Sequence, residues 1–224
     1  MFTNVNLAAP LGALALVGTG FLLMLLALAF VYTLAKRKSR ANKLVLAAAV
    51  LLVGVYVGVL LVFSFTSSEQ ALARGQEKHF CELDCHLAYS IVGVTDAKTI
   101  GSANAKGTFR SITIKTRFDE NTISPRRGNG LLYPNSRVVM LVDDQGRKYE
   151  PDPTAQHVLQ STNASGSPMT TPLRPAEAYT TTIAFDLPVD AHNPTLIIHE
   201  GEWLTHFVIG HENSPLHKQT KFQL

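Results

Sequence analysis

The sequence predicts two membrane-spanning helices followed by an all-β domain, and three observations support this prediction. Two long apolar runs without any charge lie near the N-terminus, at residues 11–35 and 44–65. From about residue 88, short segments alternate between apolar and polar side chains, and Pro and Gly separate them. The charge follows the same division, because the first 66 residues hold five basic and no acidic residues, whereas the rest holds 15 basic and 17 acidic residues.

The two apolar runs are 25 and 22 residues long. About 20 apolar residues in a helix cross a hydrocarbon core of about 30 Å, so each run is long enough to span a bilayer. The first run is not preceded by a basic segment and exceeds the apolar core of a signal peptide, which disfavours a cleaved leader. Residues 1–66 are therefore predicted to form a transmembrane hairpin.

The segment between the runs, residues 36–43, carries all five basic residues of the hairpin. The positive-inside rule places this loop in the cytoplasm. The protein is then a multi-pass protein of the cell membrane, and the domain after residue 66 is periplasmic or extracellular. The spans contain no ionisable residue of the kinds that carry protons or ions, and no basic surface for a nucleic acid is expected. The expected partners are the lipid bilayer and other membrane-protein subunits.

Gly54 and Gly58 form a small-xxx-small pair in the second span. Such pairs let helix backbones approach closely. Two interpretations stay open: the pair packs the hairpin on itself, or it docks the hairpin against another membrane subunit.

Residues 67–87 are predicted to form a stalk and a cysteine segment. The stretch 67–79 is polar and compatible with a helix apart from Gly75, so it is expected to continue the second helix.

Residues 88–224 are predicted to form an antiparallel β-sandwich, because short alternating segments and turn residues follow one another closely. Strands are expected at 108–118, 137–142, 147–149, 180–187, 195–199 and 203–209. The turn Asp143–Gly146 predicts a hairpin. Residues 160–171 are expected to be a mobile loop, and the single Trp203 is expected in the core.

Four segments of this region are LVDDQGRKY (141–149), PLRPAEAY (172–179), IAFDLP (183–188) and IGHENS (209–214). Together they resemble the telokin-like, immunoglobulin-fold domain of unknown function found on bacterial secreted and membrane-anchored proteins. The resemblance implies an immunoglobulin-like sandwich in which His211 and His217 belong to the sandwich. It brings no catalytic residues.

The only two cysteines, Cys81 and Cys85, lie between the stalk and the sandwich. A disulfide between them is the first interpretation, because the predicted compartment is oxidising and a C-x-x-x-C pair can close in a turn. Such a bond would stiffen the junction.

Copper is the second interpretation. The two thiolates and the imidazoles of His79 and His86 form a soft set of ligands suited to Cu or Zn, and His211 or His217 could add a ligand. The C-x-x-x-C spacing is similar to that of cytochrome oxidase subunit II, which also has two N-terminal helices and an outward β domain, and to that of the Sco-type copper chaperones. In subunit II, however, the loop lies near the end of the domain, and the chaperones have a thioredoxin-like fold.

A covalent haem is the third interpretation, with His86 as its proximal ligand. The motif Cys81-x-x-x-Cys85-His86 is one residue longer than the usual c-type attachment motif.

The sequence contains none of the HExxH, phosphate-loop or Gly-x-Ser-x-Gly motifs. We therefore expect a protein that is not an enzyme and has no cofactor: an accessory subunit of a larger membrane complex, with a respiratory or photosynthetic electron-transfer complex as the preferred host. The alternative is a copper-binding or redox protein that uses Cys81, Cys85 and His86.

Overall fold

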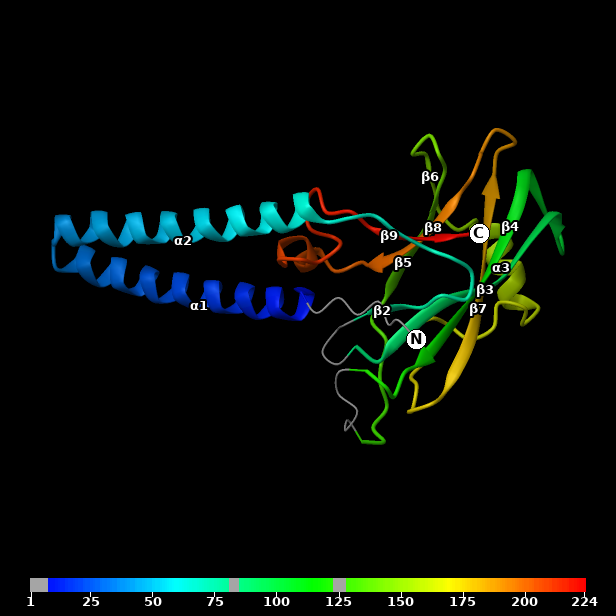
Figure 1. The fold of residues 1–224 in the computed structure, drawn as a ribbon, viewed down its shortest axis with the longest axis horizontal. Helices are drawn as coiled ribbons and strands as arrows, with labels where there is room; N and C mark the ends of the chain where they lie inside the picture. Colours follow the sequence, from blue (N-terminus) through cyan, green and yellow to red (C-terminus); the bar gives the residue numbers. More distant parts are fainter. Residues whose placement is uncertain (1–7, 81–84, 123–127) are drawn as a thin grey trace. The chain divides into compact units, whose positions relative to one another are not determined.

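The computed structural model describes residues 8–80, 85–122 and 128–224 (Figure 1). The chain divides into two compact units. The helical unit comprises both long helices and the segment Glu202–Lys218, and the β unit comprises Glu69–Gly201 and Gln219–Leu224.

The helical unit contains α1 (Ala8–Ala35) and α2 (Ser39–Thr66), which run antiparallel side by side in Figure 1. Both are long and apolar enough to cross a membrane. The less exposed side chains of each helix recur every three or four residues, which is the spacing of packed antiparallel helices. They include Leu16, Thr19, Leu23 and Leu26 on α1, and Val45, Ala49, Leu52, Tyr56 and Leu60 on α2. The two predicted helices are confirmed.

Gly54 and Gly58 do not lie on this seam. Gly54 is two residues from Tyr56, which at about 100° per residue turns it about 160° away from the seam. A Cβ atom built at either glycine meets nothing within 4 Å in the described chain. The interpretation that the pair packs the hairpin on itself is therefore wrong, and docking against another subunit stays a prediction.

The segment Glu202–Lys218 returns to the helices instead of completing the sandwich. The expected strand at 203–209 is wrong, because Trp203–Phe207 form a 3₁₀ helix. The expected core position of Trp203 is also wrong, since this residue is 65% exposed. His211 and His217 likewise belong to the helical unit. An apolar run has the same composition whether it fills a core or a short helix, so composition did not distinguish the two.

The β unit is a sandwich of two sheets. The strands of the first sheet are, in spatial order, β2 (Lys78–Phe80), β3 (Leu87–Ile100), β4 (Ala103–Phe118) and β7 (Ala178–Leu187). Those of the second are β1 (Gln70–Leu72), β9 (Thr220–Gln223), β8 (Thr195–Glu200), β5 (Arg137–Val142) and β6 (Lys148–Tyr149). The predicted strands before residue 200 and the predicted turn at 143–146 are confirmed.

The core lies between the inner faces of the sheets. Its fully buried members include Tyr89, Ile112, Ile114, Phe118 and Phe185 from the first sheet, and Leu141, Leu196, Ile198 and Phe222 from the second. Strand alternation explains which residues are buried, because in β4 every second residue from Ile112 to Phe118 points inward.

A helix that the sequence reading missed, α3 (Pro153–Ser161), packs on the outer face of the first sheet. Its Leu159 and Ala155 cover Phe109 of β4. The signal for this helix was present, since the Asp152 carboxylate accepts a hydrogen bond from Ala155 N at 2.8 Å and Pro153 occupies the first turn. The expected loop at 160–171 begins inside the last turn of α3.

The expected helical stalk is also wrong. Helix α2 ends at Thr66, and residues 67–80 contribute a strand to each sheet. Strand β1 pairs parallel with β9, and β2 pairs antiparallel with β3. Three polar residues of this stretch, Glu77, Lys78 and His79, bind partners in the sandwich.

Candidate functional site

Four charged or polar residues meet on the outer face of the first sheet, next to the predicted cysteine segment. Register explains their meeting. His79 of β2 is opposite Ala88 of β3, and Ala88 is opposite Arg117 of β4. Residues in register share a face, and the small Ala88 leaves room for the two long side chains above it. Glu77 and Asp119, two residues from His79 and Arg117, fall on the same face by alternation.

The four side chains form one connected network. The guanidinium of Arg117 donates to both oxygens of Glu77, at 2.8 and 2.7 Å. It also lies 3.1 Å from Asp119 Oδ2. His79 Nε2 lies 2.9 Å from the same oxygen. Because a carboxylate only accepts, we assign the proton of this bond to Nε2.

The network is more buried on its histidine side. The side chains of His79 and Asp119 are 0% and 6% exposed, whereas those of Arg117 and Glu77 are 26% and 24% exposed. Nδ1 of His79 is buried and has no hydrogen-bond partner in the described part of the chain. Among the described residues, the Asp119 carboxylate is therefore the hydrogen-bond partner of the His79 ring.

Both carboxyl groups are held in the ionised form. The Arg117 hydrogen bonds lower the pKa of Glu77 below its ordinary value. Burial alone would raise the pKa of Asp119, but hydrogen bonds from His79, the Asn121 backbone and Arg117 outweigh it, and the pKa is lowered. The pKa of Arg117 is raised, first by its bonds to Glu77.

His86 contacts the backbone of Asp119. Its Nδ1 contacts the backbone carbonyl of Asp119, and Thr122 Oγ1 lies 2.9 Å from the same nitrogen. The ring is 1% exposed and stacks on Phe118, with 4.9 Å between centroids. The two histidines that the sequence singled out therefore meet at one residue, which the sequence reading did not single out.

Of the two cysteines, one lies within the described residues. Cys85 is fully buried, has a positive φ of 55°, and is not a free thiol. Cys81 lies outside the described residues. The disulfide, copper and haem interpretations, which all need Cys81, stay predictions.

Ligand atoms of Glu77, His79 and Asp119 lie within 4.8 Å of one another, a spacing that a metal ion could use. The guanidinium of Arg117, however, is already bonded to both carboxylates. An incoming cation would have to displace this resident cation, so the carboxylate pair does not favour a metal. The chemistry of this cluster is that of a buried structural ion network.

Two polar alternations in the sequence could have pointed to the network: Glu77-x-His79 and Arg117-x-Asp119. Each places two polar side chains on one face of a strand. Joining the two strands requires their register through β3, which no local pattern contains.

A second ion network closes the β5–β6 turn. Arg147 donates to Asp143 Oδ2 at 2.7 Å and to Asp190 Oδ2 at 2.6 Å, and Tyr149 donates to Asp143 at 2.8 Å. Desolvation would raise the pKa of Asp143, but the bonds from Arg147 and Tyr149 lower it to about 2. This carboxylate is a fixed part of the turn.

Two cations lie in the interior between the sheets. Lys78 Nζ donates to the carbonyl of Ile198 at 2.6 Å, which joins one sheet to the other. It also lies 4.6 Å from the centre of the Phe80 ring, and the guanidinium of Arg137 lies 4.2 Å from the same centre. Such contacts between cations and aromatic rings contribute to the packing of the sandwich.

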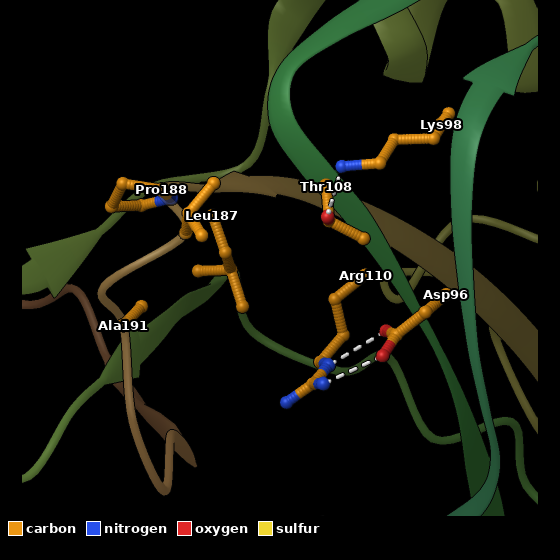
Figure 2. A pocket seen from close by; sticks show the side chains of 8 residues that line it. Asp96, Lys98, Thr108, Arg110, Leu187, Pro188 and Ala191 are labelled. Carbon is orange, nitrogen blue, oxygen red and sulfur yellow. Dashed lines mark hydrogen bonds and ion pairs between the residues drawn. The ribbon is translucent and has the colours of Figure 1, made fainter.

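An open pocket of about 220 Å³ lies at the other end of the first sheet (Figure 2). Arg110 makes a bidentate ion pair with Asp96 at 2.8 and 2.7 Å, and Figure 2 shows these two bonds. Lys98 donates to the Gly107 carbonyl at 2.7 Å and to Thr108 Oγ1 at 3.0 Å. Arg110 is thus paired with a carboxylate, whereas both acceptors of Lys98 are neutral and leave its positive charge in place.

Comparisons with known proteins gave no family assignment. No family model matches the chain, and no curated protein matches it. The solved structures that are similar include the secreted protein MPT63 of Mycobacterium tuberculosis, at 12% identity and a TM-score of 0.43, with 71% of this chain and 100% of that chain covered. A conserved hypothetical protein of Bacillus anthracis is similar at 13% identity and 0.41, over 57% and 89% of the two chains. The yjhA protein of Bacillus subtilis is similar at 11% identity and 0.39, over 68% and 98%. At these identities and TM-scores the likenesses say nothing of what the present chain binds or does.

Proposed function

We propose that this chain is a non-enzymatic, membrane-anchored accessory subunit of a larger membrane complex, with its sandwich on the outer side of the membrane. The hairpin is the anchor. The basic residues of the loop between α1 and α2 favour a cytoplasmic position for that loop. The β unit then lies in the periplasm or outside the cell.

One observation carries the proposal: α2 presents Gly54 and Gly58 on the side opposite its seam with α1. Both glycines are exposed, and a Cβ atom at either has open space around it. In lipid, small residues at this spacing are where a second helix can approach closely, since apolar side chains alone give helices little reason to associate. This face suits a transmembrane helix of a partner subunit.

The β unit supports a structural role for the outer domain. Three charge clusters of the described β unit are neutralised by its own residues: the Glu77–Arg117–Asp119–His79 network, the Asp143–Arg147–Asp190 turn and the Asp96–Arg110 pair. Saturated ion pairs rigidify a fold and leave little polar capacity for chemistry on a substrate. A rigid domain is what a supporting or covering subunit requires.

The test is native purification. The full chain, tagged and expressed in its own host, is extracted with a mild detergent, and the proteins that elute with it are quantified by mass spectrometry. We expect one or more integral membrane proteins in constant ratio to the chain. Elution as a monodisperse chain without any membrane partner would contradict the proposal.

A further inference from the structure

The segment Glu202–Lys218 is bound to the ends of both long helices, and Figure 1 shows it in orange and red beside them. The hydroxyl of Tyr56 donates to the carbonyl of Phe207 at 2.6 Å. On α1, Gly12 lies so close to the segment that an added Cβ would overlap the carbonyl oxygen of Ile209. At the end of the segment, Lys218 N donates to Ser67 Oγ at 2.8 Å.

These contacts give the depth of the segment along the helices. Tyr56 is nine residues before Phe65, the end of the apolar run, which at 1.5 Å per residue is about 13 Å. Gly12 is one residue inside the outer end of the apolar run of α1. The segment therefore extends from the rim of the apolar band to a depth on the order of 10 Å, within one leaflet of a hydrocarbon core of about 30 Å.

The segment exposes several large apolar side chains, although Val208 and Ile209 are buried and His206 is exposed. Trp203, Leu204 and Phe207 are 65%, 52% and 49% exposed, and the two aromatic rings meet edge to face at 5.7 Å. Asn213 and Ser214 are buried. Three large apolar side chains in one short helix would normally face a core, so their exposure here is unusual for a surface in water.

Several polar groups of this segment satisfy one another. Asn213 Nδ2 donates to Thr205 Oγ1 at 2.9 Å, and the Asn213 carbonyl is 2.6 Å from His206 Nδ1. Ser214 Oγ donates to the carbonyl of Val208. Backbone hydrogen bonds follow the turns, from Thr205 to Glu202, Val208 to Thr205, His211 to Val208 and Ser214 to His211. Irregular backbone at membrane depth requires this kind of internal satisfaction.

We propose that residues 202–218 form a lipid-facing wedge that inserts Trp203, Leu204 and Phe207 into the outer leaflet. The occupant of the exposed apolar surface is lipid, since the surface continues that of α1 and α2 and presents Trp, the residue enriched at membrane interfaces. Glu202 and Lys218 carry charges at the two ends of the wedge, and Glu212 adds a half-buried carboxyl group within it. The inference rests on the membrane anchoring proposed above, and it adds a third membrane contact to the two helices.

The test uses Trp203, the single tryptophan of the chain. The full chain is placed in phosphatidylcholine nanodiscs, whose two faces are both open to the buffer, and its intrinsic fluorescence is measured. Lipids brominated near the headgroup or near the chain end are compared as quenchers from inside the membrane, and iodide as a quencher from the water. We expect the shallow bromines to remove most of the emission and iodide to have little effect.

A matched control moves the reporter to the sandwich, as V189W in a W203F background, because Val189 is 84% exposed in the β unit. This reporter should be quenched by iodide and not by bromines. Quenching of Trp203 by iodide would overturn the wedge, and so would protection from both quenchers, which would mean that protein covers the residue. If the chain does not enter nanodiscs at all, the anchoring itself fails, whereas an anchored chain with a water-exposed Trp203 refutes the wedge alone.

Discussion

The imidazole of His79 and the carboxylate of Asp119 meet at 2.9 Å although forty residues separate them in the sequence, and both side chains are almost fully buried. Asp119 also accepts from Arg117, and its backbone carbonyl contacts His86. One residue at the end of β4 thus fixes the region that precedes and follows the cysteine segment. This arrangement yields the first prediction.

Replacing Asp119 by Asn should destabilise the sandwich by on the order of 3 kcal/mol, because a buried ionic network loses its central charge while its partners stay in place. The measurement is thermal unfolding of the full chain in mild detergent. Asp96→Asn is the matched control, since its ion pair with Arg110 is more exposed and should contribute less than about 1 kcal/mol. Equal effects of the two changes would contradict the account of the network.

The pH dependence of stability should reflect Asp143. Its folded pKa of about 2 lies below the ordinary value of 3.8, so the carboxylate stabilises the fold above pH 4, and this contribution is lost as the pH falls from about 4 to about 2. Unfolding temperatures of the wild type and of Asp143→Asn should differ at neutral pH and converge in acid. Asp144→Asn, one residue along the same turn, serves as the control. A difference between the wild type and Asp143→Asn that persists unchanged to pH 2 would show that the ionised carboxylate is not its source.

Replacing Gly12 by Leu should displace the wedge, because the new side chain would overlap the carbonyl of Ile209. Gly18→Leu on the same helix is the control, since a Cβ there meets nothing within 4 Å. We expect a shift of the Trp203 emission spectrum in the first variant and none in the second. Identical spectra in both variants would mean that the close approach at Gly12 does not hold the wedge.

The cysteine segment should contain a disulfide and no bound metal. Cys85 is not a free thiol, and the neighbouring carboxylates are neutralised by Arg117. Elemental analysis and a thiol count on natively purified, denatured protein should find no stoichiometric metal and no free thiol until a reductant is added. Copper near one equivalent, with both thiols titrating after its removal and the metal lost in Cys81→Ser, would favour the copper interpretation instead.

Local patterns were enough for the features that depend on neighbouring residues. The uncharged runs predicted α1 and α2, and the alternation around Ile112 and Ile114 predicted β4, because both signals are contained in one stretch of chain. The turn at 143–146 was predicted for the same reason. Helix α3 carried its signal in Asp152 and Pro153, and the polar stretch that follows concealed it.

The rest depends on relations between distant segments. His79 and Arg117 share a face only because β3 sets their register, with Ala88 between them. The stretch around Trp203 is apolar in the manner of a core strand, and its actual surroundings are decided by its contacts with Gly12 and Tyr56. No local period encodes such contacts, so the wedge could not be predicted.

The most direct measurement of the central claim is the native mass of the detergent-extracted assembly for the wild type and two double variants. The first, Gly54→Leu with Gly58→Leu, fills the free face of α2. The second, Val55→Leu with Val59→Leu, places the same side chains one residue along the helix, at positions that are 56% and 39% exposed. The account predicts a wild-type mass well above that of the 24.4 kDa chain, its loss in the glycine variant and its retention in the valine variant. A wild-type mass equal to the single chain in its micelle, or a glycine variant that keeps the full assembly, would contradict it.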